Sequence, residues 1–242
     1  MKRILSYVRR AIEDYNMIEE GDRIAIGVSG GKDSLTLLCA LKELQRFYPK
    51  KFELEAITLD MGFKDADFSK VQKMCEKIGV NYTVKPTNIA EIVFDIRKEK
   101  NPCSLCAKLR QGALHNAALE LGCRKVALAH HFDDVLETFF LSLFFEGRIN
   151  CFSPVTYLDK KDIYLIRPMI YTPEKDIKGL VKRMNFPVVF NPCPANGHTK
   201  RQYMKDLIRQ LNKENKGLKK RIFGAIQRSE IDGWNIPSVL DR

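Results

Sequence analysis

The chain has 242 residues, 45% of them hydrophobic, and a formal net charge of +11 at pH 7. A chain of this length buries a substantial core, and the lack of an apolar run at its N-terminus argues against export and membrane association, so we expect a cytoplasmic protein. The charge favours a polyanionic partner, nucleic acid before a membrane surface, although a merely basic soluble protein is the alternative.

Apolar, β-branched runs alternate with helical patterns along most of the chain. The expected strands cover residues 24–28, 54–59, 80–84, 125–129 and, more weakly, 163–166. The expected helices cover residues 4–15, 34–47, 67–78, 105–121, 133–145 and 173–184. This alternation predicts an α/β fold, a doubly wound parallel sheet of about five strands, with the loops after Val28, Leu59 and Ala129 converging at one edge.

The two ends of the chain differ from this pattern. We expect residues 1–22 to form an N-terminal helical segment and residues 23–190 to form the main domain. Residues 191–242 are expected to form a C-terminal appendage, which starts with a cysteine loop rich in Pro and Gly. A basic helix over about 199–213 and a further helix over 218–228 follow.

A Gly-Gly-Lys loop joins the first expected strand to its helix, in the sequence Ser29-Gly30-Gly31-Lys32-Asp33-Ser34. Paired glycines, a helix N-terminus and a lysine together predict a phosphate cradle, although a simple turn is the alternative. Asp33 stands where a Walker A loop requires Ser or Thr. The six residues instead resemble the PP-loop of ATP pyrophosphatases, which adenylate a substrate and release pyrophosphate.

Three of the seven cysteines are candidate metal ligands. Cys103 and Cys106 start an expected helix, where we expect the helix end and nearby cations to lower their pKa, and Cys193 follows Asn-Pro as Cys103 does. A Cys-x-x-Cys pair alone admits zinc, an iron-sulfur cluster or redox cycling. The other four cysteines are expected to pack in the core or to be incidental: Cys39, Cys75, Cys123 and Cys151.

A second polar motif, His130-His131-Phe132-Asp133-Asp134, follows the expected strand that ends at Ala129. Its position at the carboxyl end of a strand predicts contact with a ligand. Asp133 is a candidate for holding Mg²⁺ against phosphates or orienting the substrate, whereas Asp134 is equally explained as a helix N-terminal residue. Of the two histidines, His131 is the better candidate for a structural role.

The motifs together resemble the tRNA 2-thiocytidine synthetase family. The resemblance implies a 4Fe-4S cluster on Cys103, Cys106 and Cys193, ATP on the PP-loop, tRNA as substrate and a homodimer. The similar archaeal-type tRNA 2-thiouridine synthetases carry zinc-binding Cys-x-x-Cys modules at both ends, which this sequence lacks. The sequence after Cys193 is less similar to the thiocytidine family, so the target base stays open.

The expected roles divide into three groups. Catalysis is assigned to Lys32, Asp33, Asp133, Cys103 and Cys193, with Asp33 and Asp133 also as candidate Mg²⁺ ligands. ATP binding is assigned to Val28, Ser29, Gly30, Gly31, Lys32, Asp33, Ser34, Asp60 and His130; Asp60 is alternatively only a strand end. Contacts with tRNA phosphates are assigned to Lys108, Arg110, Lys200, Arg201, Lys205 and Arg209, whose alternative is a solvated surface. Sulfur would come from a cysteine desulfurase or free sulfide.

Four alternatives remain open at this stage. The three cysteines could form a zinc site with a fourth ligand such as His198. The enzyme could ligate an amine, as lysidine synthetase does, or act on a small molecule. The chain could also be a metal-containing RNA-binding protein without catalysis. Release of AMP and pyrophosphate that depends on tRNA would exclude this last class.

Overall fold

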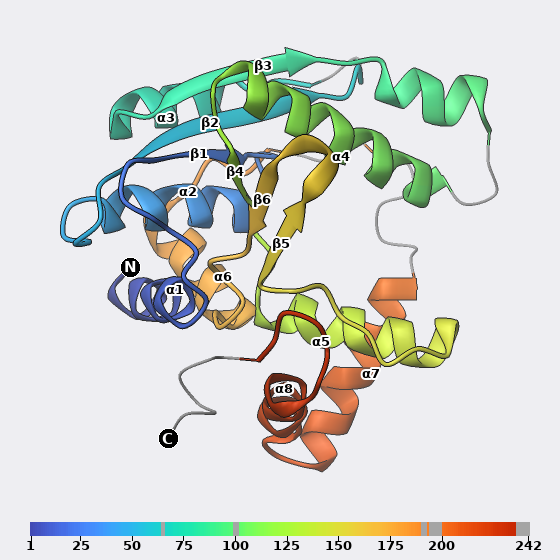
Figure 1. The fold of residues 1–242 in the computed structure, drawn as a ribbon. Coiled ribbons are helices and arrows are strands. Elements are labelled where there is room, and N and C mark those ends of the chain that lie inside the picture. The colour runs from blue at the N-terminus through green and yellow to red at the C-terminus, as the bar shows by residue number, and fades with distance from the viewer. Residues whose placement is uncertain (64–65, 99–101, 190–192, 194–199, 236–242) are drawn as a thin grey trace.

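A computed structural model describes residues 1–63, 66–98, 102–189, 193 and 200–235. It contains a six-stranded sheet in the order β3-β2-β1-β4-β6-β5 (Figure 1). The strands are β1 (Asp22–Gly27), β2 (Phe52–Asp60), β3 (Asn81–Pro86), β4 (Lys125–Ala127), β5 (Val155–Leu158) and β6 (Ile163–Ile166). All neighbouring pairs are parallel except β5 and β6, which are antiparallel. The doubly wound α/β fold is therefore confirmed.

Helices cover both faces of this sheet (Figure 1). They are α1 (Lys2–Asp14), α2 (Lys32–Leu44), α3 (Ser69–Ile78), α4 (Pro102–Glu120), α5 (Phe132–Leu141), α6 (Glu174–Met184), α7 (Lys200–Glu214) and α8 (Leu218–Arg228). Short π-helical turns, η1 (Glu91–Ile96) and η2 (Ser142–Glu146), precede α4 and extend α5, and the 3-10 turn η3 (Asp159–Lys161) joins β5 to β6. One face packs on α4, and the other supports the larger core formed with α1, α2, α5 and α6.

The strand β5 and the turn η1 were not expected from the sequence. Residues 155–158 are too few to show a periodic pattern, and this edge strand has no fully buried side chain. It pairs with β6 through a short turn, as antiparallel strands can, whereas the parallel strands require helical crossovers. The sheet therefore has one more strand than expected, added at its edge.

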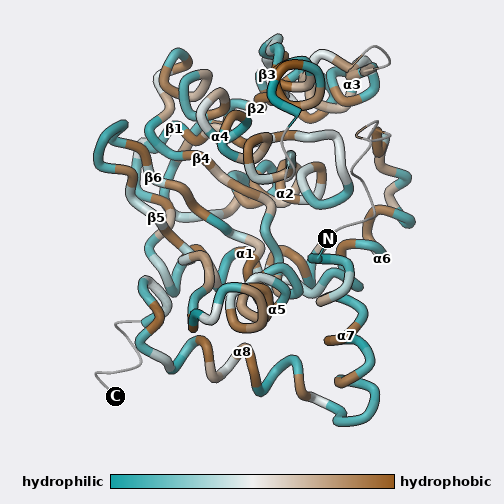
Figure 2. Tube along the Cα trace, turned by 90° about the vertical axis from the view of Figure 1, so that its right-hand side faces the viewer, coloured by the Kyte–Doolittle hydropathy of each residue, from teal (hydrophilic) through white to brown (hydrophobic). Residues whose placement is uncertain are grey.

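The core explains why the central strands form where the sequence indicated. Ile24, Ala25 and Ile26 of β1 are fully buried, as expected for a strand covered on both faces. Figure 2 shows hydrophobic residues along the central strands and on α5. The apolar side of α1 joins the same core cluster as β1. None of the helices in the described ranges is long and apolar enough to cross a membrane.

The strand order creates a switch point beside β1. Strands β2 and β4 lie on opposite sides of β1, so the chain continues in a different direction from the carboxyl end of each of these two strands. Crevices of this kind, outside the carboxyl ends of parallel strands, are where doubly wound proteins bind ligands. The Gly-Gly-Lys loop after β1 and the His-His segment after β4 both lie there.

Candidate functional site

The loop between β1 and α2 presents a helix N-terminus without a side-chain cap among the described residues. Gly30 has a φ of +75°, which residues with a Cβ rarely adopt, and Gly31 is the N-cap of α2. The Ser34 hydroxyl donates to the Gly31 carbonyl over 3.0 Å and lies 3.3 Å from the Ser29 hydroxyl. The first N–H groups of α2 and its positive dipole end are therefore available to an anion.

Gly30 also touches a segment far away in the sequence. The backbone N–H of Val189 donates to the Gly30 carbonyl over 3.0 Å. A Cβ on Gly30 would lie 2.9 Å from Cβ of Val189, which is closer than such atoms approach. Val189, which precedes Cys193 by four residues, therefore packs on the glycine loop.

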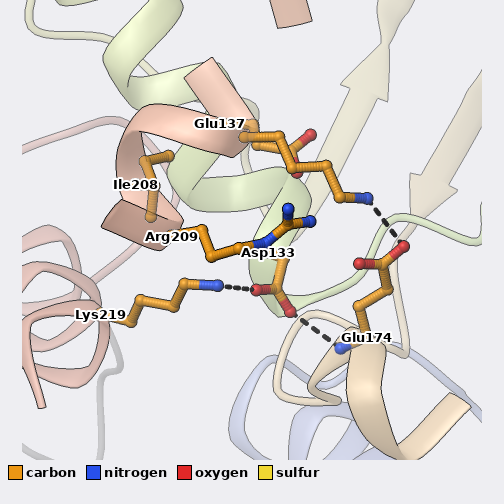
Figure 3. Close-up of a pocket in the computed structure, with 7 residues that line it drawn as sticks. Asp133, Glu137, Glu174, Ile208, Arg209 and Lys219 are labelled. Atoms are coloured by element: carbon orange, nitrogen blue, oxygen red, sulfur yellow. Dashed lines mark hydrogen bonds and ion pairs between the residues drawn. The ribbon is translucent and has the colours of Figure 1, made fainter. Parts of the chain in front are cut away.

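Asp133 joins three helices through its carboxylate. Its Oδ2 accepts from the backbone N–H of Glu174 over 2.8 Å, and its Oδ1 accepts from Nζ of Lys219 over 2.7 Å (Figure 3). Burial alone would raise the pKa of Asp133, but Lys219 and the Glu174 N–H outweigh it and lower the pKa. Both oxygens thus hold α6 and α8 against α5, and the Mg²⁺ ligand role expected of Asp133 stays a prediction.

The pocket beside Asp133 is lined by charged groups from four helices (Figure 3). Its lining residues are Asp133, Glu137, Glu174, Lys205, Ile208, Arg209 and Lys219. Three carboxylates and three cationic groups line it, so the opposite charges largely compensate one another within the pocket.

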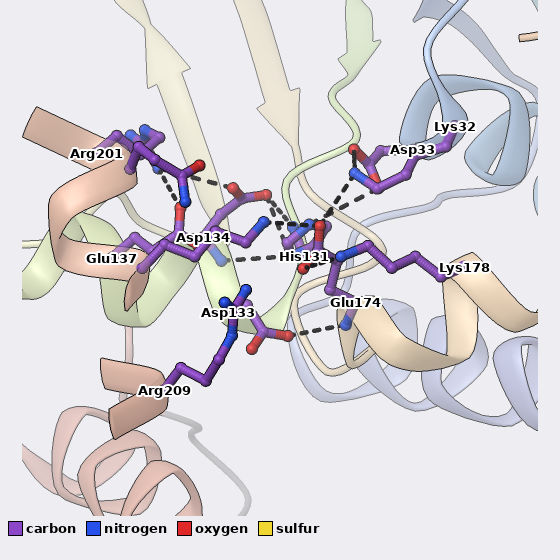
Figure 4. A network of polar contacts seen from close by, with 12 residues as sticks. Lys32, Asp33, His131, Asp133, Asp134, Glu137, Glu174, Lys178, Arg201 and Arg209 are labelled. Carbon is purple, nitrogen blue, oxygen red and sulfur yellow. Dashed lines mark hydrogen bonds and ion pairs between the residues drawn. The ribbon is translucent and has the colours of Figure 1, made fainter. Parts of the chain in front are cut away.

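Lys32 is held between two carboxylates (Figure 4). Its Nζ lies 2.7 Å from Oδ2 of Asp33 and 3.3 Å from Oε1 of Glu174. Lys205 and Lys178 contact the same Glu174 carboxylate at 2.8 and 3.1 Å. Burial would raise the pKa of Glu174, yet the three ammonium groups lower it to about 2. Glu174 therefore keeps two cationic partners when Lys32 turns toward a phosphate.

Asp33 is the carboxylate with spare acceptor capacity near the loop. Its Oδ1 is buried and accepts no hydrogen bond from the residues that the structure describes. The nearest group is Nε2 of His131, at 3.7 Å. This geometry leaves Asp33 better placed than Asp133 for the expected Mg²⁺ or positioning role, which stays a prediction.

His131 performs a structural task and also faces the glycine loop. It is the N-cap of α5: its Nδ1 accepts from the Asp134 N–H over 3.3 Å, and its own N–H donates to Oδ2 of Asp134 over 2.9 Å. This reciprocal arrangement is a capping box. The structural role expected for His131 and the helix-start role considered for Asp134 both agree with it. The 3.7 Å approach to Asp33 brings together the loops after β1 and β4.

His130, the histidine expected to contact ATP, packs against an aromatic ring. Its ring centroid lies 4.7 Å from that of Phe152. Burial, with the nearby guanidinium of Arg167, lowers the pKa of His130 to about 4. The side chain is therefore neutral at pH 7, and its ATP contact stays a prediction.

The lowered pKa of His130 predicts a pH dependence of stability. Between pH 6.5 and 4 the unfolded chain binds a proton at this position and the folded chain does not, so folding loses stability as the pH falls through this window. The expected contribution is about 2 kcal/mol between pH 7 and 4.5. Urea unfolding at the two pH values should show a smaller loss for His130→Gln than for the parent chain. An equal loss in both proteins would contradict the assignment.

Asp60 ends β2 as a turn residue. Its Oδ1 accepts from the backbone N–H of Gly62 over 2.9 Å, and its carbonyl accepts from the Thr87 hydroxyl over 2.7 Å. The neighbouring Thr58 hydroxyl donates to the Val28 carbonyl over 2.5 Å and fixes the start of the glycine loop. The adenosine contact expected of Asp60 stays a prediction.

The seven thiols fall into two groups. Cys75, Cys123 and Cys151 are buried, and burial raises the pKa of Cys39 and Cys151 to about 12 and of Cys75 and Cys123 to about 11. Cys75, Cys123 and Cys151 are core residues, and Cys39 is half-buried on α2, which agrees with the core or incidental role expected of the four. In contrast, Cys103 is exposed, and Cys106 and Cys193 are half-buried.

The three accessible thiols lie close enough to influence one another. Burial raises the pKa of Cys106, and the proximity of Cys193 and Cys103 raises it further, while Arg110 lowers it. The expected lowering of the Cys106 pKa is therefore wrong for the metal-free thiols, because burial outweighs the adjacent cation. Within the described ranges, no three His, Cys, Asp or Glu side chains form a group arranged to hold a metal ion. The thiols therefore match an iron-sulfur cluster in donor type, but the structure does not bring the three together as a ready metal-binding group. His198 lies outside the described residues.

Some cations expected to bind tRNA already have protein partners. Arg201 contacts Glu137 at 3.4 Å and Asp134 at 3.6 Å, and Lys205 contacts Glu174. Arg209 pairs with Asp206 and lines the pocket. The exposed Lys108 and Arg110 on α4 and Lys200 on α7 face solvent.

Sequence reasoning missed Glu174 and Glu137, and it considered Lys219 only as one of the C-terminal basic residues expected to contact tRNA phosphates. Glu174 starts α6 shortly after β6, at the same edge of the sheet as the motifs that were identified. Ligand sites lie at the carboxyl ends of parallel strands, and applying this rule to the weaker expected strand 163–166 would have indicated Glu174. For Glu137 and Lys219 the sequence offers no such signal, because charged residues on helices usually face solvent.

Comparisons with known proteins agree with the geometry. Residues 4–214 match the PP-loop domain family. The tRNA-cytidine(32) 2-sulfurtransferase of Teredinibacter turnerae is 39% identical over 229 residues, 94% of this chain and 76% of that protein. The protein of the same name from Geobacter metallireducens is 38% identical over 228 residues, 93% of this chain and 89% of that protein. The U34-tRNA thiolase NcsA of Methanococcus maripaludis, solved with its 4Fe-4S cluster, shares the fold with a TM-score of 0.73 at 24% identity, covering 90% of this chain and 75% of that one.

Proposed function

This chain belongs to the PP-loop family that contains the tRNA-cytidine(32) 2-sulfurtransferases, and we propose that it replaces the C2 oxygen of a tRNA cytidine with sulfur at the expense of ATP. One juxtaposition supports this above all. The Val189 N–H bonds to Gly30 four residues before Cys193, which supports the proposal that the phosphate loop and a candidate sulfur-handling thiol serve one site.

Adenylation would use the groups around α2. The C2 oxygen of the base attacks the α-phosphorus of ATP, and the bond to pyrophosphate breaks. The N–H groups at the start of α2 and the Lys32 ammonium stabilise the negative charge that develops on pyrophosphate. Ser29 and Ser34 offer hydroxyls to the phosphates, and Asp33 has an acceptor for Mg²⁺. The oxygen then leaves with AMP when sulfur attacks C2.

Cys103, Cys106 and Cys193 would hold a 4Fe-4S cluster. A cluster bound by three thiolates offers one iron without a protein ligand, where sulfide can bind. The thiols must lose their protons for this, and Arg110 beside Cys106 favours the thiolate. The proposal includes a cysteine desulfurase or free sulfide as the sulfur source, a homodimer and a cytoplasmic location. The target base would lie in the anticodon loop.

Nucleoside mass spectrometry of tRNA from cells lacking this gene tests the function. We expect 2-thiocytidine to disappear and to return when the gene is restored. Loss of 2-thiouridine instead would assign the chain to the thiouridine enzymes, and unchanged thionucleosides would contradict thiolation. With purified protein, AMP and pyrophosphate release should depend on tRNA.

Binding of tRNA should weaken steeply with salt. Each phosphate contact contributes a slope of about −0.7 to −0.9 in log affinity against log salt concentration. Lys108→Ala, on the exposed face of α4, is expected to reduce the slope by about one such unit. Filter binding at several salt concentrations measures this. An affinity that does not change with salt would contradict phosphate contacts.

A further inference from the structure

Three exposed aromatic rings form a surface that no step of the proposed chemistry uses. Phe144, Phe145 and Tyr203, here called the aromatic patch, are 58%, 43% and 60% exposed. They come from η2 and from the first turn of α7, and the Phe145 and Tyr203 rings meet edge to face with centroids 6.5 Å apart. Phe144 directly precedes Phe145 in the chain, and neighbouring exposed apolar groups of this kind mark interaction surfaces in soluble proteins.

The Phe144 ring of the aromatic patch is held in place by neighbouring rings. Phe144 stacks on Phe140, with ring centroids 5.7 Å apart and planes within 12°. Phe140 meets Phe139 edge to face, and both pack against the main core. A ligand that stacks on Phe144 therefore meets a ring whose orientation is already set, which reduces the entropic cost of binding.

Positive charge accompanies the rings. The Lys200 ammonium lies 4.5 Å from the centroid of the Phe145 ring, and the exposed Arg148 follows η2. Arg201 lies next to Lys200 at the start of α7. Flat rings beside cations are the combination with which proteins bind single-stranded nucleic acid, since bases stack on the rings and phosphates contact the cations.

The aromatic patch and the candidate cluster thiols lie on the same side of the molecule. Figure 1 shows the end of α5 and the start of α7 on the side where α4 begins, and α4 begins with Cys103 and Cys106. Figure 2 looks onto this side, with α5 almost end-on. An RNA strand whose base reaches the thiols would thus pass near the rings.

We propose that the aromatic patch binds unpaired bases of the RNA substrate by stacking and so holds the single-stranded loop for thiolation; this inference rests on the proposed function. RNA fits the surface better than a second copy of the chain. An interface with a second copy would have to bury the charges of Lys200 and Arg148, which is costly, whereas RNA supplies phosphate to both.

Two single substitutions, Phe144→Ala and Tyr203→Ala, test the inference. Each should weaken binding of an RNA hairpin with an unpaired loop by roughly 5- to 150-fold, the range for loss of one stacked base. The slope of log affinity against log salt should stay unchanged, because the rings neutralise no phosphate. Binding of a fully paired RNA of equal length should change little. Phe47→Ala is the matched control, since Phe47 is also an exposed phenylalanine (54%) beside arginines.

Fluorescence anisotropy measures the affinities, and sedimentation velocity measures the oligomeric state of each variant. Hairpin affinity equal to that of the parent would overturn the inference, as would a variant that dissociates a dimer, which would assign the surface to a second copy. The parent enzyme's thiolation of tRNA is measured in parallel. If the parent thiolates tRNA and the variants bind normally, the inference fails while the proposed function stands. If the parent neither binds nor thiolates tRNA, both fail.

Discussion

Alanine in place of Lys32 is expected to slow tRNA-dependent release of AMP and pyrophosphate by about 100- to 1,000-fold. The substitution removes the full positive charge next to the α2 N-terminus, where charge develops on the leaving group. It also leaves the carboxylates of Asp33 and Glu174, now 2.7 and 3.3 Å from the ammonium, without this partner. Both effects oppose binding of a polyanion. Single-turnover release of labelled pyrophosphate measures the loss.

Lys178→Ala is the matched control for this change. Lys178 contacts the other oxygen of the same Glu174 carboxylate, at 3.1 Å. Its side chain is more exposed than that of Lys32, and it does not belong to the glycine loop. We expect it to retain activity within a few-fold of the parent, since an exposed ion pair contributes only about 0 to 1 kcal/mol. Equal losses in the two variants would show that Lys32 acts only by neutralising Glu174. Affinity for tRNA should be similar in both.

Replacing Cys193 by alanine is expected to remove iron and acid-labile sulfide and to reduce thiolation at least 100-fold. Loss of outer-shell partners alone costs metal sites 10- to 100-fold, roughly, and a lost ligand costs more. Adenylation uses the groups of the glycine loop, so pyrophosphate release with tRNA should persist. Iron, sulfide and zinc analysis of anaerobically prepared protein measures the first effect, and nucleoside mass spectrometry measures the second.

Cys39→Ala controls for the loss of a thiol as such. Cys39 lies on α2, where burial raises the pKa of its thiol to about 12. This thiol should therefore bind no metal, and its removal should not affect thiolation. A parent protein with one zinc and no sulfide would contradict the cluster. Normal iron content in Cys193→Ala would exclude this residue as a ligand.

The parts of the fold that follow from local pattern were predictable from the sequence. Strand β1 is a continuous apolar run that is buried on both faces. The Gly-Gly-Lys loop contains a glycine, Gly30, at a positive φ that other residues rarely adopt. Strand β5 was not predictable, because four residues at a sheet edge carry no periodicity and its pairing with β6 is a tertiary contact.

The candidate site was predictable only in its motifs. Lys32 and Asp33 are evident from the glycine loop. Glu174, the second carboxylate beside Lys32, lies 142 positions after that lysine and resembles any acidic residue at a helix start. The role of Asp133 could not be predicted from a sequence pattern either. Its partner Lys219 lies 86 residues later in the chain, and their contact depends on how α8 packs. Such pairs form because folding brings helices together, and no local spacing encodes them.

The bond between Val189 and Gly30 has a thermodynamic consequence for assembly of the enzyme. A ligand that fixes Gly30 also restrains the chain four residues before Cys193. We therefore expect the proposed nucleotide and cluster sites to be linked in binding free energy, and linkage is reciprocal: each ligand changes the affinity for the other by the same factor. Cluster affinity measured with and without nucleotide should therefore change by the same factor as nucleotide affinity measured with and without the cluster.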